Sequence, residues 1–165
     1  MSSTSVYELF KTKVNRIDEL RNGHGSGPAI WDYISHKLYG KRFDMFNDKD
    51  FWPSYKDNRL DDDEKAVLLS TYDRSFIEVD HLAEFANACK KVHDRIINTT
   101  NWEWSHFYAI GEAADKLNKK HDYRCKGLAI GCTSVDDIWE QEDTKSIDSW
   151  GVYEQIESMK KKIQI

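Results

Sequence analysis

The segment 22–28, Asn-Gly-His-Gly-Ser-Gly-Pro, contains three of the eight glycines of the chain. Glycine accepts positive φ values and lets a backbone approach another group closely. A glycine-rich turn that leads into a helix presents free N–H groups at the positive end of the helix dipole, where phosphate or carboxylate binds. His24 is the candidate acid–base catalyst of such a site, because the pKa of histidine lies near neutrality. The candidate ligand-binding residues are Arg21, Gly23, His24, Gly25, Ser26 and Gly27.

The same segment also suits a tight turn between two helices. Its spacing matches neither the P-loop nor the dinucleotide-binding fingerprint, and it follows a predicted helix rather than a strand. In this interpretation Ser26 caps the next helix and the glycines only satisfy the backbone geometry. The sequence therefore leaves a ligand site and a simple turn as alternatives.

Two Glu-x-x-His pairs form a second candidate for chemistry. A carboxylate and an imidazole three residues apart share one face of a helix and can bind the same metal ion. Here the pairs fall on consecutive predicted helices, whereas di-metal bundles alternate this motif with helices that carry a single glutamate. We therefore predict no cofactor, and a divalent metal site is a further alternative. Its ligands would be Glu78, His81, Glu103 and His106.

Aromatic side chains are dense in two short segments, 43–55 and 102–108. Tryptophan and tyrosine dominate the binding energy of many protein interfaces, so an exposed aromatic cluster indicates a partner surface. Packing in the core is the alternative for both segments. The candidate partner-binding residues are Phe51, Trp52, Trp102 and Trp104.

Charge and composition restrict the partners. The net charge of −5 disfavours binding to nucleic-acid phosphates and suits a basic partner protein. No apolar run approaches the roughly 20 residues that span a bilayer, and the N-terminal residues lack the pattern of a secretory signal. Three cysteines at irregular spacing do not form a disulfide framework. We therefore expect a cytoplasmic protein that is not associated with a membrane.

Apolar residues at three- and four-residue spacing predict helices over most of the chain. The pattern covers residues 4–21, and a second helix runs from Ser26 to Gly40. An irregular connection is expected over 41–60. Asp61 with Glu64 has the spacing of a capping box and predicts a short third helix.

The same spacing continues through the second half of the chain. Ser75 with Glu78 predicts the start of a long helix through Ile96, and another helix follows Asn101. The last helix is expected over about 146–163, and the apolar segment 127–132 suits either a short buried strand or an extended segment. The expected fold is a single mainly α domain over 1–165, a bundle of about six helices with this one short strand.

The sequence contains no complete catalytic motif and leaves open whether the protein is an enzyme. Its size, acidity and aromatic content favour a binding protein of the accessory or inhibitor type, such as those encoded by phages and mobile elements. The expected partner is a macromolecule, most simply another protein. A small phosphorylated or carboxylated ligand at 22–28, enzymatic or sensory, is the alternative, and the di-metal site is a further one.

Overall fold

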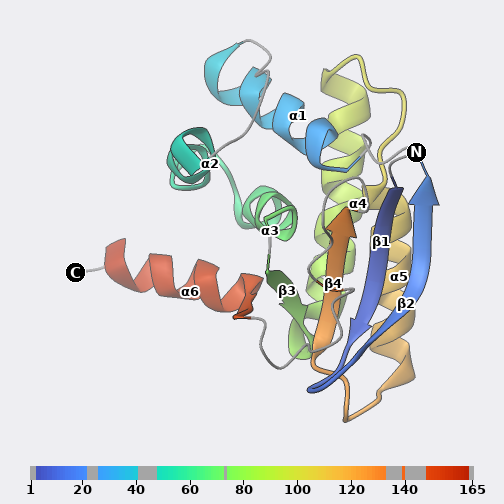
Figure 1. Cartoon of the computed structure of the whole chain (residues 1–165). Coiled ribbons are helices and arrows are strands. Elements are labelled where there is room, and N and C mark those ends of the chain that lie inside the picture. The colour runs from blue at the N-terminus through green and yellow to red at the C-terminus, as the bar shows by residue number, and fades with distance from the viewer. Residues whose placement is uncertain are drawn as a thin grey trace.

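The protein contains a five-stranded mixed sheet in the order β2-β1-β4-β3-β5. Figure 1 labels its first four strands. The computed structural model describes residues 3–21, 26–40, 48–72, 74–132, 139 and 148–163. The strands are β1 (Ser3–Leu9), β2 (Val14–Arg21), β3 (Ser75–Glu78), β4 (Gly127–Cys132) and β5 (Trp150–Gly151). The helices are α1 (Gly27–Tyr39), α2 (Asp48–Tyr55), α3 (Asp62–Ser70), α4 (Leu82–Thr99), α5 (Phe107–Lys120) and α6 (Val152–Ile163).

The prediction of a mainly α bundle is wrong, and the largest error lies at the N-terminus. Residues 3–21 form the antiparallel hairpin β1–β2, whose turn is closed by the Phe10 N–H bonding to the Lys13 carbonyl at 2.9 Å. Every residue of β1 is buried, because β1 lies between β2 and β4 and is covered on both faces. A strand buried on both faces loses the period of two, so its apolar residues coincided with a helical spacing.

Three other boundaries also differ from the predictions. The segment 75–78 is strand β3 rather than the first turn of a helix, and α4 begins only at Leu82. Helix α2 lies inside the segment expected to be irregular. The last helix begins at Val152, directly after the short strand β5. In each case a partner distant in sequence determines the structure, and local periodicity contains no signal of it.

Three local predictions are confirmed. Helix α1 follows Ser26 and ends at Gly40, which has a φ of 69° as a glycine C-cap requires. The capping box at α3 has both of its bonds, since the Glu64 N–H bonds to Asp61 and the Asp61 N–H bonds to Glu64, each at 2.9 Å. The apolar segment 127–132 is strand β4, which pairs with β1 and β3.

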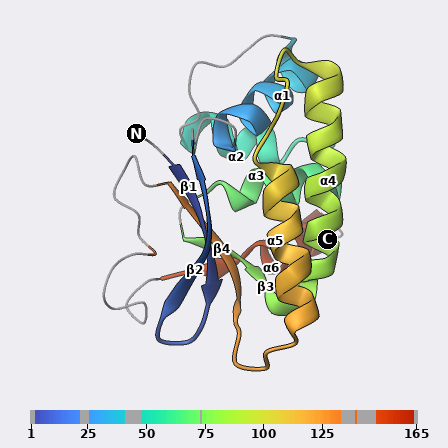
Figure 2. The same cartoon turned by 90° about the vertical axis from the view of Figure 1, so that its right-hand side faces the viewer.

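Helices α4 and α5 run antiparallel and cover one face of the sheet (Figure 2). The main core lies between these helices and the sheet, where Val6 of β1 and Leu128 of β4 meet Phe85 of α4. A second, smaller cluster with Tyr7 and Trp139 is centred on the opposite face. None of the helices in the described part of the chain has the length and apolar composition needed to cross a bilayer.

A buried polar network fixes α1 against α3. The Glu64 carboxylate is fully buried and accepts hydrogen bonds from the Tyr33 hydroxyl at 2.6 Å and from Lys37 Nζ at 2.7 and 2.8 Å. Burial and the bond to Glu64 raise the pKa of Tyr33, so its hydroxyl keeps its proton. A buried carboxylate is tolerated when its oxygens are satisfied in this way. The network sets the position of α1, which carries two residues of the candidate site.

Candidate functional site

An open pocket of about 540 Å³ lies between α1 and the connection from α4 to α5. Helix α1 contributes one carboxylate and one imidazole, and the connection contributes two indoles, an amide and a second carboxylate. The lining residues are Asp32, His36, Asn101, Trp102, Glu103 and Trp104. The pocket therefore joins residues that are about seventy positions apart in the chain.

The inner wall of the pocket is held by the hydrogen bonds of Trp102. Trp102 Nε1 donates to Asp32 Oδ2 at 3.1 Å, and His36 Nε2 lies 3.5 Å from Asp32 Oδ1. The backbone N–H of Trp102 bonds to Thr100 Oγ1 at 3.1 Å, which fixes the start of the connection. Asp32 is only 8% exposed. Its carboxylate is thus oriented before any ligand arrives.

The outer wall is the Trp104 side chain, which is 44% exposed. Its ring centroid lies 4.9 Å from that of His106, with the two planes tilted by 51°. His106 is buried, and its Nε2 lies 3.1 Å from the Arg21 carbonyl oxygen, to which it donates. Burial lowers the pKa of His106, and the bond to Arg21 opposes this shift in part. A neutral imidazole therefore supports the exposed indole and ties the connection to the end of β2.

The charges of the lining favour a cation. Asp32 and Glu103 are acidic, and within the described part of the chain no lysine or arginine lines the pocket. Indole faces attract ammonium and guanidinium groups through the ring quadrupole. Carboxylates form strong charge-assisted hydrogen bonds with the same groups. The pocket can therefore bind the end of a lysine or arginine side chain.

The nearest serine–histidine pair does not give this pocket a nucleophile. His93 Nδ1 lies 2.8 Å from Ser105 Oγ, and Ser105 is only 6% exposed. The same oxygen accepts a hydrogen bond from the Phe107 N–H at 3.3 Å, in the first turn of α5. Ser105 thus makes a local side-chain bond just before that helix, whose N-cap residue is His106. Ser105 is therefore buried and already bonded to His93 and to the Phe107 N–H.

The glycine-rich segment is described only in part, because Gly23, His24 and Gly25 lie outside the described residues. Ser26 precedes α1, and its Oγ lies 3.0 Å from Thr4 Oγ1, which joins α1 to β1. A Cβ at Gly27 would lie 2.9 Å from the Trp31 ring, so Gly27 is needed for that packing. Next to these residues is a cavity of only about 110 Å³. Their contacts are those of a helix start packed on the sheet.

Arg21, also predicted as a ligand residue, contributes its backbone carbonyl to the bond with His106. It lies at the end of β2, and its side chain is exposed. Among the described contacts, Arg21 therefore meets the candidate site through its backbone carbonyl, which holds His106 in place.

The four proposed metal ligands do not come together. Glu78 accepts the N–H groups of Tyr153 at 3.0 Å and Glu154 at 2.7 Å, so its carboxylate caps α6. His81 stacks on Tyr153 with ring centroids 4.5 Å apart. These two residues precede α4, whereas the second pair precedes the antiparallel α5, at the far end of α4. An 18-residue helix such as α4 is about 27 Å long.

No group of three or more metal-ligating side chains is found among the residues that the structure describes. Glu103 lines the acidic pocket, and His106 supports Trp104, so the second Glu-x-x-His pair belongs to the candidate site in a role other than metal binding.

The predicted partner-binding residues fall into two environments. Phe51 is 3% exposed and belongs to the core, and Trp52 packs against Tyr72 with ring centroids 5.0 Å apart. Trp102 and Trp104 line the open pocket.

Sequence reasoning missed Asp32 and His36, which complete the pocket. The available signal was an acidic residue on a helix stripe that is otherwise apolar, with a histidine one turn later.

Comparison of the chain with protein-family models, curated proteins and solved structures found no match.

Proposed function

We propose that this protein acts by binding a basic partner protein, and that the pocket between α1 and the α4–α5 connection receives a lysine or arginine side chain of that partner. The observation that carries the proposal is the combination of two carboxylates, Asp32 and Glu103, with two indoles in one open pocket. The net charge of −5 supports it, because an acidic surface attracts a basic protein over a longer range.

Arginine fits this pocket better than lysine. Its planar guanidinium stacks on an indole face and presents a fork of donors to a carboxylate at the same time. Trp104 supplies an exposed face and Glu103 an exposed carboxylate. Asp32, whose carboxylate is buried and bonded to Trp102, adds its negative charge from the inner wall. A cation over an indole contributes about 0.5–1 kcal/mol at an exposed site and about 2 kcal/mol when it is desolvated.

The proposal includes a cytoplasmic location. Cys89 and Cys125 are free and buried, which suits a reducing compartment.

The test is a titration with a capped Gly-Arg-Gly peptide, monitored by tryptophan fluorescence and by the indole N–H signals in a ¹⁵N NMR spectrum. The matched control peptide contains citrulline, which has the shape of arginine without its charge. We expect the arginine peptide to shift the Trp102 and Trp104 signals and the citrulline peptide to leave them in place. Equal shifts with both peptides would contradict recognition of a cation.

Three variants locate the binding site. We expect Asp32→Asn and Trp104→Ala each to weaken binding about tenfold or more, which corresponds to about 1.4 kcal/mol. Glu112→Gln removes an exposed carboxylate that pairs with Lys90 on α4, away from the pocket, and serves as the control with unchanged binding. Unchanged binding in both pocket variants would rule out this site.

A further inference from the structure

Among the described strands, β2 is an edge of the sheet and pairs with β1 alone (Figure 1). Figure 2 looks onto its free side. The edge at the other end of the sheet, β5, has only two residues, whereas β2 has eight. A free edge strand presents unpaired N–H and C=O groups that can pair with another chain. Of the two edges, β2 is therefore the one long enough to pair with a strand of another chain.

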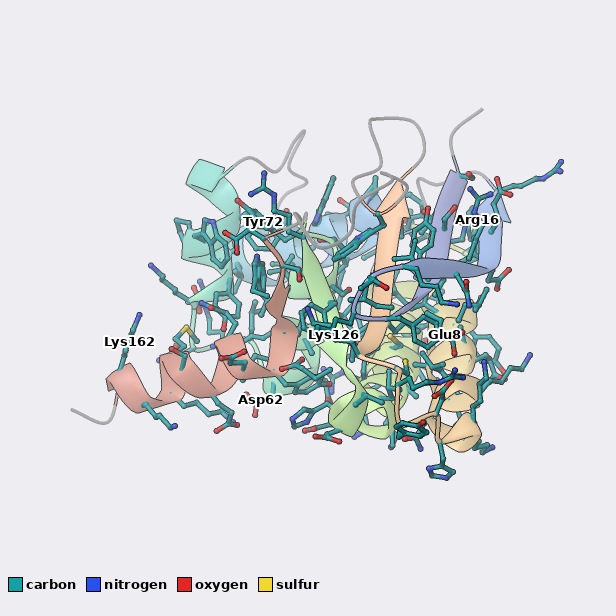
Figure 3. The ribbon with its side chains drawn as sticks, turned by 60° about the horizontal axis from the view of Figure 1, so that its bottom comes forward. Glu8, Arg16, Asp62, Tyr72, Lys126 and Lys162 are labelled. Carbon is teal, nitrogen blue, oxygen red and sulfur yellow. The ribbon has the colours of Figure 1, made fainter. Side chains whose placement is uncertain are left out.

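A bulge in β2 determines which side chains share a face. Val6 pairs with Asp18 and Tyr7 pairs with Arg16, so Ile17 is the extra residue. Because of this bulge, Arg16 and Glu19 lie on the same face of the sheet, opposite Tyr7 and Ser5. Arg16 Nη1 lies 3.4 Å from Glu19 Oε2, and both side chains are almost half exposed. Figure 3 shows Arg16 at the outer margin of the molecule.

We propose that β2 pairs antiparallel with β2 of a second copy of this chain, around a twofold axis between Ile17 and Asp18. The proposal is independent of the acidic pocket. In this register Arg16 lies opposite Glu19 of the second copy, and the symmetry repeats the pair. Opposite charges that face each other across two strands stabilise the pairing, and like charges destabilise it. The register also keeps the core-facing side chains of both copies on the same side.

Charges and a bulge usually protect an edge strand from association. On β2, Arg16 and Glu19 have opposite signs at positions related by the proposed axis, so they complement each other in this register. The two pairs within the chains, one in each copy, are exchanged for two pairs between the chains. Surface pairs contribute little individually, which makes the exchange easy. Charge complementarity is thus the reason to choose a second copy as the occupant of this edge.

A groove of about 440 Å³ between β2 and α5 adjoins this edge. It is lined by Ile17, Tyr108 and Lys116, among others, and Ile17 and Tyr108 are 41% and 54% exposed. The groove reaches Glu8 of β1 (Figure 3). Lys120 Nζ of α5 lies 2.9 Å from Glu8 Oε2. An added β2 strand would cover these apolar side chains. It would also bring Asp18 of the second copy to the face that Lys116 lines.

The test is the molar mass of the full chain by light scattering after size exclusion, over a range of concentrations. We expect wild type to reach the mass of a dimer as its concentration rises. Arg16→Glu and Glu19→Arg should each be monomeric, because each places like charges opposite one another at both pairs. An equimolar mixture of the two variants should again form a dimer, since their charges then complement each other.

The mixture separates association between chains from an effect within one chain. Circular dichroism and thermal unfolding check that each variant is folded, and Lys91→Glu, which breaks the pair between Lys91 of α4 and Asp63 of α3, is the control with the mass of wild type. A wild-type chain that stays monomeric at every concentration overturns the proposal. A dimer that neither substitution affects, or a mixture that stays monomeric, also overturns it.

Discussion

Two aromatic clusters of this protein have different environments in the structure. The inner cluster joins Phe51, Trp52, Tyr72 and Trp150, with neighbouring ring centroids 4.8–6.3 Å apart. The outer cluster places Trp102 and Trp104 beside a carboxylate in an open pocket. The number of aromatic rings does not distinguish a core from a binding surface. The contacts of the rings do: the inner rings pack on other rings, whereas Trp102 bonds to a carboxylate.

Distance along the chain explains why the clusters differ. Trp52 lies in α2 and Trp150 lies in β5, so the inner cluster forms only when these two segments, distant in sequence, come together. The outer cluster consists mainly of neighbours in one connection, and these cannot bury one another. Helix α1 adds Asp32, which bonds to Trp102. A polar partner keeps one end of an aromatic side chain at the boundary between core and solvent.

The largest expected effect is in the inner cluster. Phe51→Ala should lower the free energy of unfolding by about 3–5 kcal/mol, because it leaves a cavity among rings that cannot collapse into it. Urea unfolding measured by circular dichroism checks this value. Trp104→Ala is the paired variant and should stay within about 0.5 kcal/mol of wild type. Equal losses in the two variants would remove the distinction between the clusters.

A smaller effect is expected where the outer cluster meets the core. Trp102→Phe keeps an aromatic ring and removes the Nε1–H that bonds to Asp32. The loss of one hydrogen-bond donor to a buried acceptor costs about 1–3 kcal/mol. Trp104→Phe is the control, since Trp104 is exposed and should tolerate the change. If both variants unfold at the same urea concentration as wild type, the bond does not contribute to stability.

The smallest expected effect is on the pH dependence of stability. Burial lowers the pKa of His106 in the folded protein, so the unfolded chain takes up the proton first as the pH falls. The contribution of His106 is therefore complete above the ordinary pKa of about 6.5 and declines below it. His106→Asn should show a weaker fall in the urea midpoint between pH about 7.5 and about 5.5. A fall as steep as that of wild type would show that His106 is not responsible.

The sequence predicted those elements whose signals are local. The α3 capping box and the glycine at the end of α1 depend on residues a few positions apart, and both were predicted from the sequence. The hairpin β1–β2 was not predicted, because β1 pairs with β4, which lies more than a hundred residues later in the chain. Trp102 and Trp104 were found as candidates from their types. Their partner Asp32 was not, because only the fold brings it to them.

Strand β4 has a consequence for the order in which the protein acquires its structure. It lies between β1 and β3, so the N-terminal hairpin and β3 cannot belong to one sheet until residues 127–132 are inserted between them. On the ribosome, about four-fifths of the chain must therefore emerge before the sheet can close. Pairings this distant in sequence slow folding and leave strand edges exposed while synthesis continues. The helices α4 and α5 are adjacent in sequence and can form earlier, as the surface on which the late strand completes the sheet.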